Sequence, residues 1–224
     1  AFVMISMLLI FALGMFLLWR EELLKNTAHL VFTFLFMAGA VVIRYFLLDY
    51  ESGDYLSFLA PWTEFFREHG GFKALGLSVG NYNLPYLYFL ALFSYIDISE
   101  LYLIKLLSIV FDVLLAWACM KLCSLFTKGR LRLIVCFFAV LLFPTVVLNG
   151  AYWAQCDSIY TFFAVLSLYL ALSDKPVGAM VSITASFAFK LQAVFVMPVF
   201  FVLLVAKKIK FKHLFIFPAA YLVM

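Results

Sequence analysis

Long apolar runs with almost no charged residues limit what this chain can fold into. A helix that crosses a lipid bilayer needs about 20 mainly apolar residues and keeps its backbone hydrogen bonds internal. Apolar residues make up 67% of the 224 residues and charged residues only 12%, too few charges to cover a soluble domain. The expected helices cover residues 1–19, 29–48, 99–126, 131–149, 158–173, 177–189, 193–206 and 213–224.

We therefore predict an all-α fold, a polytopic transmembrane helical bundle in which residues 1–224 form a single transmembrane domain. The chain begins without an initiator methionine and ends at Met224 inside an apolar run, which indicates that the protein continues beyond it. The apolar stretch 177–206 is interrupted by a lysine and a glutamine at 189–192. It is either one bent helix or two short spans, and the charges of its flanking loops favour two spans.

The loops alternate in charge, which predicts their orientation. Short cytoplasmic loops carry an excess of Lys and Arg. One set of loops has eleven basic residues against the acids Glu21, Glu22 and Asp174. The other set, 49–98 with Glu100 and 149–157, has Arg67 and Lys73 against eight acids. We expect the first set to be cytoplasmic. The basic residues of that set are Arg20, Lys25, Lys121, Lys128, Arg130, Arg132, Lys175, Lys207, Lys208, Lys210 and Lys212.

The outer loop 49–98 is the one long connection, and long loops in compact proteins are usually functional. It opens with three carboxylates in six residues: Asp49, Glu51 and Asp54. Residues 55–69 place apolar side chains at helical spacing and end at Gly70-Gly71, which predicts an amphipathic helix on the membrane surface. The apolar piece 84–96 is too short for an ordinary span and predicts a second interfacial helix.

The second outer loop, 149–157, adds a further carboxylate, Asp157, beside Trp153 and Gln155. Two basic residues near helix ends, Arg44 and Lys105, and Lys190 in the next outer turn are expected on the same side. A carboxylate can act as general base on a hydroxyl, and Lys or Arg can stabilise a departing phosphate. The pattern therefore favours transfer chemistry with an anionic lipid headgroup.

Two short motifs carry a family resemblance. Gly53-Asp54-Tyr55 is followed by Pro61-Trp62, and the second loop reads Trp153-Ala154-Gln155-Cys156-Asp157-Ser158. In this order the chain resembles the GT-C glycosyltransferases, and most of all the prokaryotic relatives of the GPI-anchor mannosyltransferases. Those proteins have Gly-Asp-Tyr, then Pro-Trp, and later Trp-Gly-Gln-x-Asp-Ser, so Ala154 stands where they have Gly. The likeness extends over residues 29–206.

The resemblance implies transfer of a sugar, mannose or another hexose, from a polyprenyl-phosphate or dolichyl-phosphate donor on the outer or lumenal face. It implies that Asp54 is the catalytic base and that Lys190 contacts the lipid phosphate; the Lys-Pro-Gln expected there is Lys190-Leu191-Gln192 here. Asp157 would position the sugar or acceptor, or share a divalent cation (Mg²⁺ or Mn²⁺) with Asp54, which is left open. The further substrate-binding candidates are Arg44, Asp49, Glu51, Tyr82, Trp153, Gln155 and Gln192.

The partners implied are the lipid-linked sugar, a glycan, lipid or protein acceptor, and membrane lipid, without nucleic acid. A multi-pass protein of a prokaryotic plasma membrane fits the resemblance better than one of the ER membrane.

Several candidates also have plain structural interpretations. Asp54 and Asp157 each precede a helical run, where Asp is a favoured N-cap. Asp112, deep in the span 99–126, is either functional or hydrogen-bonded to a neighbouring helix. His69 fits a role at a helix end. Tyr82 and Trp153 stack on a sugar or belong to the aromatic belt of a membrane interface.

The main alternative function is a transporter or flippase for a lipid-linked or anionic substrate. A carrier places its ionisable residues deep in the bundle, near broken helices. Here the acids concentrate in outer loops, and only Asp112 is expected to lie deep. The distribution therefore favours an enzyme.

Overall fold

The computed structural model describes residues 1–224 and contains helices and no strand. Three helices are long and apolar enough to cross a membrane: α1 (Phe2–Arg20), α2 (Thr27–Leu47) and α5 (Glu100–Cys123). This confirms the all-α prediction and three of the expected long helices. The chain divides into two compact units, and each is described separately.

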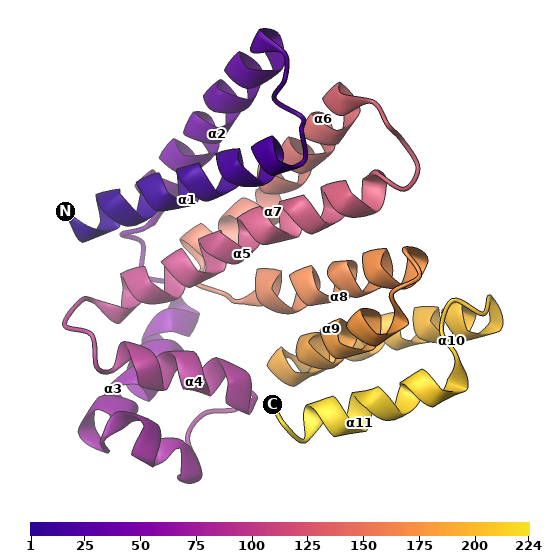
Figure 1. Ribbon diagram of the computed structural model, residues 1–224. Helices are drawn as coiled ribbons and strands as arrows, with labels where there is room; N and C mark the ends of the chain where they lie inside the picture. The colour runs from indigo at the N-terminus through magenta and orange to yellow at the C-terminus, as the bar shows by residue number, and fades with distance from the viewer. The chain divides into compact units, whose positions relative to one another are not determined.

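The first unit comprises Ala1–Ser57 and Ile98–Ser158. Its helices α1, α2, α5 and α6 (Arg130–Leu141) pack against one another (Figure 1). One apolar core joins them, with Leu18, Met37, Ile109 and Phe137 among its fully buried members. The outward faces of α1 and α2 carry large exposed apolar side chains, such as Leu9 and Phe46, as expected of helices that face lipid.

The helix ends follow from local sequence. The Asn26 side chain accepts a hydrogen bond from Ala28 N at 2.8 Å and so caps the start of α2. Helix α5 carries Glu100 in its first turn and Lys121 in its last, which suits the helix dipole at both ends.

The expected span 131–149 is not one helix. Helix α6 ends at Leu141, α7 covers Pro144–Val147, a π-helical turn covers Leu148–Tyr152, and the two parts are bent by 49°. Pro144 explains the break, because its ring has no N–H to donate and does not fit inside a helix. The predicted loop 149–157 is therefore partly helical, and only 153–156 lies between the π turn and α8 (Asp157–Leu172).

The second unit comprises Phe58–Asp97 and Ile159–Met224. The predicted helical character of 55–69 is confirmed: a π-helical turn (Tyr55–Leu59), which begins in the first unit, leads into α3 (Ala60–Glu68), and Gly70 ends it with a left-handed φ of 83°. Its location on the membrane surface stays a prediction. His69 stands at this helix end, with its Nδ1 2.9 Å from the Phe65 carbonyl oxygen, as its end-of-helix interpretation requires. A 3₁₀ turn (Gly71–Gly76) and α4 (Leu84–Phe93) follow.

The predicted break at Lys190 is confirmed. Helix α9 (Pro176–Phe189) ends there, a 3₁₀ turn (Leu191–Val196) follows, and α10 (Met197–Val205) completes the pair. The expected helix 213–224 is instead a 3₁₀ turn (Phe211–Phe215) and the short α11 (Ile216–Tyr221). Helix α11 packs against α9.

Candidate functional site

Ser52 organises the first acidic segment. Its hydroxyl accepts a hydrogen bond from Tyr55 N at 3.1 Å and donates to the Trp153 carbonyl oxygen at 2.8 Å. The helical turn that begins at Gly53 is thus capped by Ser52. The alternative that Asp54 is the N-cap is therefore wrong, and the Asp54 carboxylate is not used to cap the helix.

Asp54 instead meets the second motif. Its Oδ2 accepts a hydrogen bond from Gln155 Nε2 at 2.8 Å, while the side chain stays exposed. The two residues are 101 positions apart in the chain. A carboxylate that is held in place and reachable from solvent has the geometry that a general base needs.

Asp157 is the first residue of α8 and is half-buried. Its Oδ2 accepts a hydrogen bond from Asn149 Nδ2 at 2.9 Å, which closes the π turn and the following loop into one unit. A carboxylate in the first turn also suits the positive end of the helix dipole. Asp157 is the first residue inside α8 rather than the residue before it, so the N-cap interpretation is not confirmed, and its catalytic role stays a prediction.

Ala154 occupies the position at which the resembling family has glycine. Its φ is 59°, in the left-handed region, and its side chain is fully buried. A left-handed backbone costs an L-residue roughly 1–2 kcal/mol and is worse for a β-branched side chain. Gly relieves this strain, whereas a β-branched residue increases it.

We expect Ala154→Val to destabilise the protein by about 2–3 kcal/mol, because it adds β-branching to a left-handed backbone and volume to a filled space. Ala154→Gly should change stability by less than about 1 kcal/mol, since relief of strain offsets lost burial and added chain entropy. Thermal unfolding of both variants in detergent measures this. Equal melting temperatures for the two variants would contradict the left-handed assignment.

A stripe of three polar residues on α5 holds both acidic loops. Lys105, Ser108 and Asp112 are spaced three and four apart, so they share one face of the helix, and each is fully buried. The Lys105 ammonium donates to the carbonyl oxygens of Leu47 and Leu48 at 2.9 Å each and of Tyr50 at 2.6 Å. The Leu47 and Leu48 carbonyls belong to the end of α2, where the helix leaves acceptors unpaired, and Tyr50 lies in the segment that follows.

The other two members of the stripe hold the second loop. Ser108 Oγ donates to the Gln155 carbonyl oxygen at 2.9 Å, and Ser158 Oγ donates to Asp112 Oδ1. Gly150 packs directly over this face, where an added Cβ would lie 3.2 Å from Ser108 Cβ and 3.4 Å from Asp112 Oδ2. The loop that carries Gln155 and Asp157 is therefore fixed to α5 by its backbone as well as by side chains.

Arg44 is the partner of Asp112. Its Nε and Nη2 donate to Asp112 Oδ2 at 3.1 and 2.9 Å, and Nη2 also donates to the Leu141 carbonyl oxygen at 2.7 Å. The arginine and aspartate side chains are 1% and 0% exposed. The hydrogen-bonded interpretation of Asp112 is thus confirmed. The prediction that Arg44 contacts substrate is wrong, because its guanidinium is buried and already bonded, and Lys105 is likewise occupied by carbonyls.

The remaining candidates of the first unit are Asp49, Glu51 and Trp153. Asp49 is exposed, and its Oδ1 accepts a hydrogen bond from the Tyr102 hydroxyl at 2.8 Å; Glu51 is exposed. Trp153 is 48% exposed. Sequence reasoning missed a stacked pair, Tyr50 and Tyr152, whose rings lie 3.7 Å apart and nearly parallel. This pair adds a third tie between the two motif segments.

Three candidates belong to the second unit. The Lys190 ammonium lies 5.6 Å from the centre of the Tyr82 ring and 6.0 Å from that of Tyr160, within cation–π range. Asn83 Nδ2 donates to the Phe187 carbonyl oxygen at 3.3 Å, which ties the segment before α4 to the end of α9. Gln192 is exposed in the 3₁₀ turn that follows. The interruption between α9 and the 3₁₀ turn thus places the Lys190 ammonium near two aromatic rings.

No group of three or more His, Cys, Asp or Glu side chains is arranged so that it could hold a metal ion. Comparisons of the chain with protein-family models, with curated proteins and with solved structures found no match. The arrangement of the residues themselves is therefore the basis for a functional proposal.

Proposed function

We propose that this protein is a GT-C-type membrane glycosyltransferase that moves a hexose from a polyprenyl-phosphate donor to a hydroxyl acceptor. The observation that carries the proposal is the hydrogen bond between Asp54 and Gln155. These residues lie at the centres of the two motifs on which the resemblance rests. A contact between segments about a hundred residues apart can serve a structural core or a shared site. Asp54 is exposed rather than part of a core, which favours a shared site.

In the proposed reaction Asp54 takes the proton of the acceptor hydroxyl. The acceptor oxygen then forms a bond to the anomeric carbon as the bond from that carbon to the phosphate oxygen breaks, and the lipid phosphate leaves with the electron pair. Gln155 orients the carboxylate of Asp54, and Asp157 positions the sugar or the acceptor. In this scheme Lys190 contacts the lipid phosphate, as the resemblance implies, and a positive charge there stabilises the leaving group.

The proposal includes an orientation of the chain in the membrane. We place the acidic segments 49–98 and 149–157 on the non-cytoplasmic face of a multi-pass protein, because the basic residues concentrate in the alternate loops. A prokaryotic plasma membrane is the proposed location. A lipid-phosphate donor is available at such a surface, and acids exposed there remain solvated.

A transporter or flippase is the second candidate, and one observation favours it. Arg44, Lys105 and Asp112 are all fully buried in the first unit, and buried ionisable residues in membrane proteins often mark a transport path. Each of them is nevertheless bonded to another buried charge or to helix carbonyls. Groups that a carrier uses must exchange these partners for substrate, so we rank the enzyme first.

The test is transfer of radiolabelled sugar by the purified protein from a panel of polyprenyl-phosphate sugars. We expect label to leave the lipid fraction and appear in a glycan, lipid or protein acceptor with at least one donor. Absence of transfer from every donor, together with substrate-dependent flux across proteoliposomes, would overturn the enzyme in favour of the carrier.

A further inference from the structure

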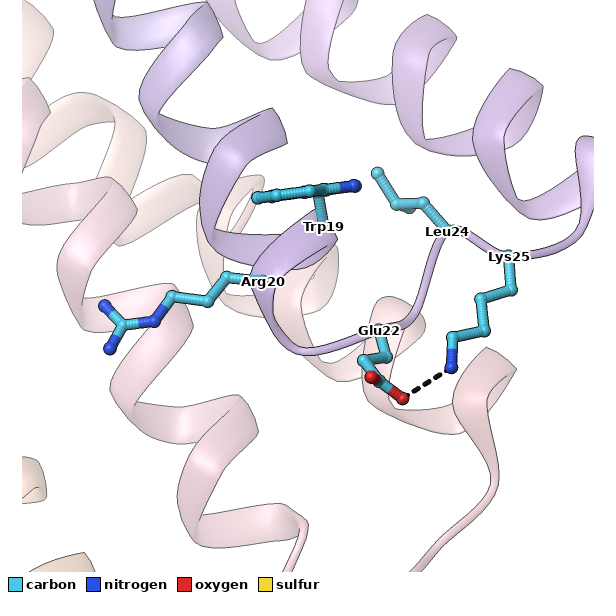
Figure 2. A pocket seen from close by; sticks show the side chains of 5 residues that line it. All are labelled: Trp19, Arg20, Glu22, Leu24 and Lys25. Atoms are coloured by element: carbon cyan, nitrogen blue, oxygen red, sulfur yellow. Dashed lines mark hydrogen bonds and ion pairs between the residues drawn. The ribbon is translucent and has the colours of Figure 1, made fainter.

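The α1–α2 turn forms a groove at the end of α2 that is opposite to the acidic loop. Its volume is about 400 Å³, and its lining residues are Trp19, Arg20, Glu22, Leu24 and Lys25. Figure 2 shows Trp19 and Leu24 forming an apolar side, with the indole nitrogen turned toward Leu24, and the Glu22–Lys25 pair forming a polar side. The groove thus combines one apolar and one charged wall.

The charges around the groove are strongly unbalanced. Lys25 donates to Glu22 at 2.6 Å and Lys121 donates to Glu21 at 2.7 Å, so both acids of the turn are already paired. The hydrogen bond from Lys25 and its positive charge lower the pKa of Glu22 from its ordinary value, and the charge of Arg130 acts in the same direction. Six basic residues lie in the α1–α2 and α5–α6 turns or in the adjoining helix ends, against these two acids: Arg20, Lys25, Lys121, Lys128, Arg130 and Arg132. The net charge around the groove is therefore positive.

The groove also lies where lipid headgroups would be. It stands at the end of α1 and the start of α2, two helices that are long and apolar enough to cross a membrane. Trp19 is 66% exposed and Phe126, in the neighbouring α5–α6 turn, is 79% exposed, as is typical of aromatic residues at a membrane interface. The Glu21–Lys121 pair and the bond from Trp117 Nε1 to Glu21 hold the α1–α2 turn against α5, the helix that leads into the α5–α6 turn.

We propose that this groove binds the headgroup of an anionic phospholipid. The phosphate accepts a hydrogen bond from the Lys25 ammonium, which uses one of its donors for Glu22. The Arg20 guanidinium points away from this pair in Figure 2 and adds to the positive charge of the surface. The apolar side formed by Trp19 and Leu24 contacts the upper part of an acyl chain. The excess positive charge selects an anionic headgroup over a zwitterionic one. This inference does not depend on the proposed glycosyl transfer, because the groove and the acidic loops lie at opposite ends of α2.

Native mass spectrometry of the delipidated full chain tests the proposal, with an equimolar mixture of phosphatidylglycerol and phosphatidylcholine that carry identical acyl chains. We expect the protein to retain phosphatidylglycerol with about ten-fold preference, since each basic residue near the surface adds modest attraction for an anionic lipid. The double variant Arg20→Gln/Lys25→Gln should bind the two lipids within about two-fold of each other.

Two matched variants separate the groove from general charge. Lys210→Gln/Lys212→Gln removes the same number of positive charges from exposed positions outside the groove and should keep the preference. Arg20→Lys/Lys25→Arg keeps the charges of the groove and should therefore also keep the preference for phosphatidylglycerol. Equal loss of preference in the Lys210/Lys212 variant would overturn the groove as the site. Displacement of the lipid by soluble glycerol phosphate would show that the site takes a free phosphate ester, and would overturn the lipid assignment.

Discussion

Replacement of Asp112 by leucine should destabilise the first unit by about 3–5 kcal/mol, because it leaves the buried Arg44 guanidinium without its anion. The Leu141 carbonyl oxygen would remain as an acceptor but carries no full charge. Arg44→Met should cost a similar amount, since it leaves the Asp112 carboxylate buried without its cation. Thermal or denaturant unfolding of the purified variants in detergent measures both effects.

The double variant Arg44→Met/Asp112→Leu tests whether an unpaired buried charge causes the loss of stability in the single variants. Apolar side chains of similar volume remove both desolvated charges, so the pair of substitutions should cost less than either one alone. The exposed ion pair Lys25–Glu22 is the control, and Glu22→Gln should leave the unfolding transition unchanged. Additive losses in the double variant would show that Arg44 and Asp112 contribute independently and that the ion pair is not what stabilises this region.

Sequence patterns predicted the helices better than their interruptions. Runs of apolar residues placed α1, α2 and α5 within a few residues of their observed ends, because lipid-facing helices need continuous apolar sequence. The break after α6 was missed although Pro144 lay in the run and gave a local signal. The π turn at 148–152 has no comparable signal, since it depends on how Asn149 and Gly150 meet Asp157 and α5.

For the candidate site, too, some features were predicted from the sequence and others were not. The contact between Asp54 and Gln155 agrees with the motifs, which placed both residues at one face. Arg44 was misassigned because a basic residue near a helix end usually faces the headgroups, whereas here a buried acid on another helix draws it inward. The spacing of Lys105, Ser108 and Asp112 on one face of α5 was available in the sequence and predicts a polar stripe. Its acceptors were not predictable, because they are backbone carbonyls of distant segments.

Replacement of Asp54 by asparagine should reduce the turnover of sugar transfer by about 10³-fold, within the range that a general base contributes. Asparagine has nearly the same shape, and its amide oxygen can accept the hydrogen bond from Gln155 Nε2. It cannot take a proton from the acceptor at neutral pH. Because Ser52 rather than Asp54 caps the following turn, the variant should unfold at the temperature of the unmodified protein.

Two further variants separate catalysis from the general effect of a carboxylate on this face. Asp49→Asn removes another exposed acid of the same loop, one that bonds the Tyr102 hydroxyl, and should change turnover by no more than a few-fold. Gln155→Ala leaves the Asp54 carboxylate in place without its orienting amide, so it should reduce turnover by about ten-fold, less than Asp54→Asn does. An Asp54→Asn variant that transfers sugar at the normal rate would remove Asp54 from the catalytic role. If Asp49→Asn lost as much activity as Asp54→Asn, the acidic loop would act through its summed charge rather than through one positioned base.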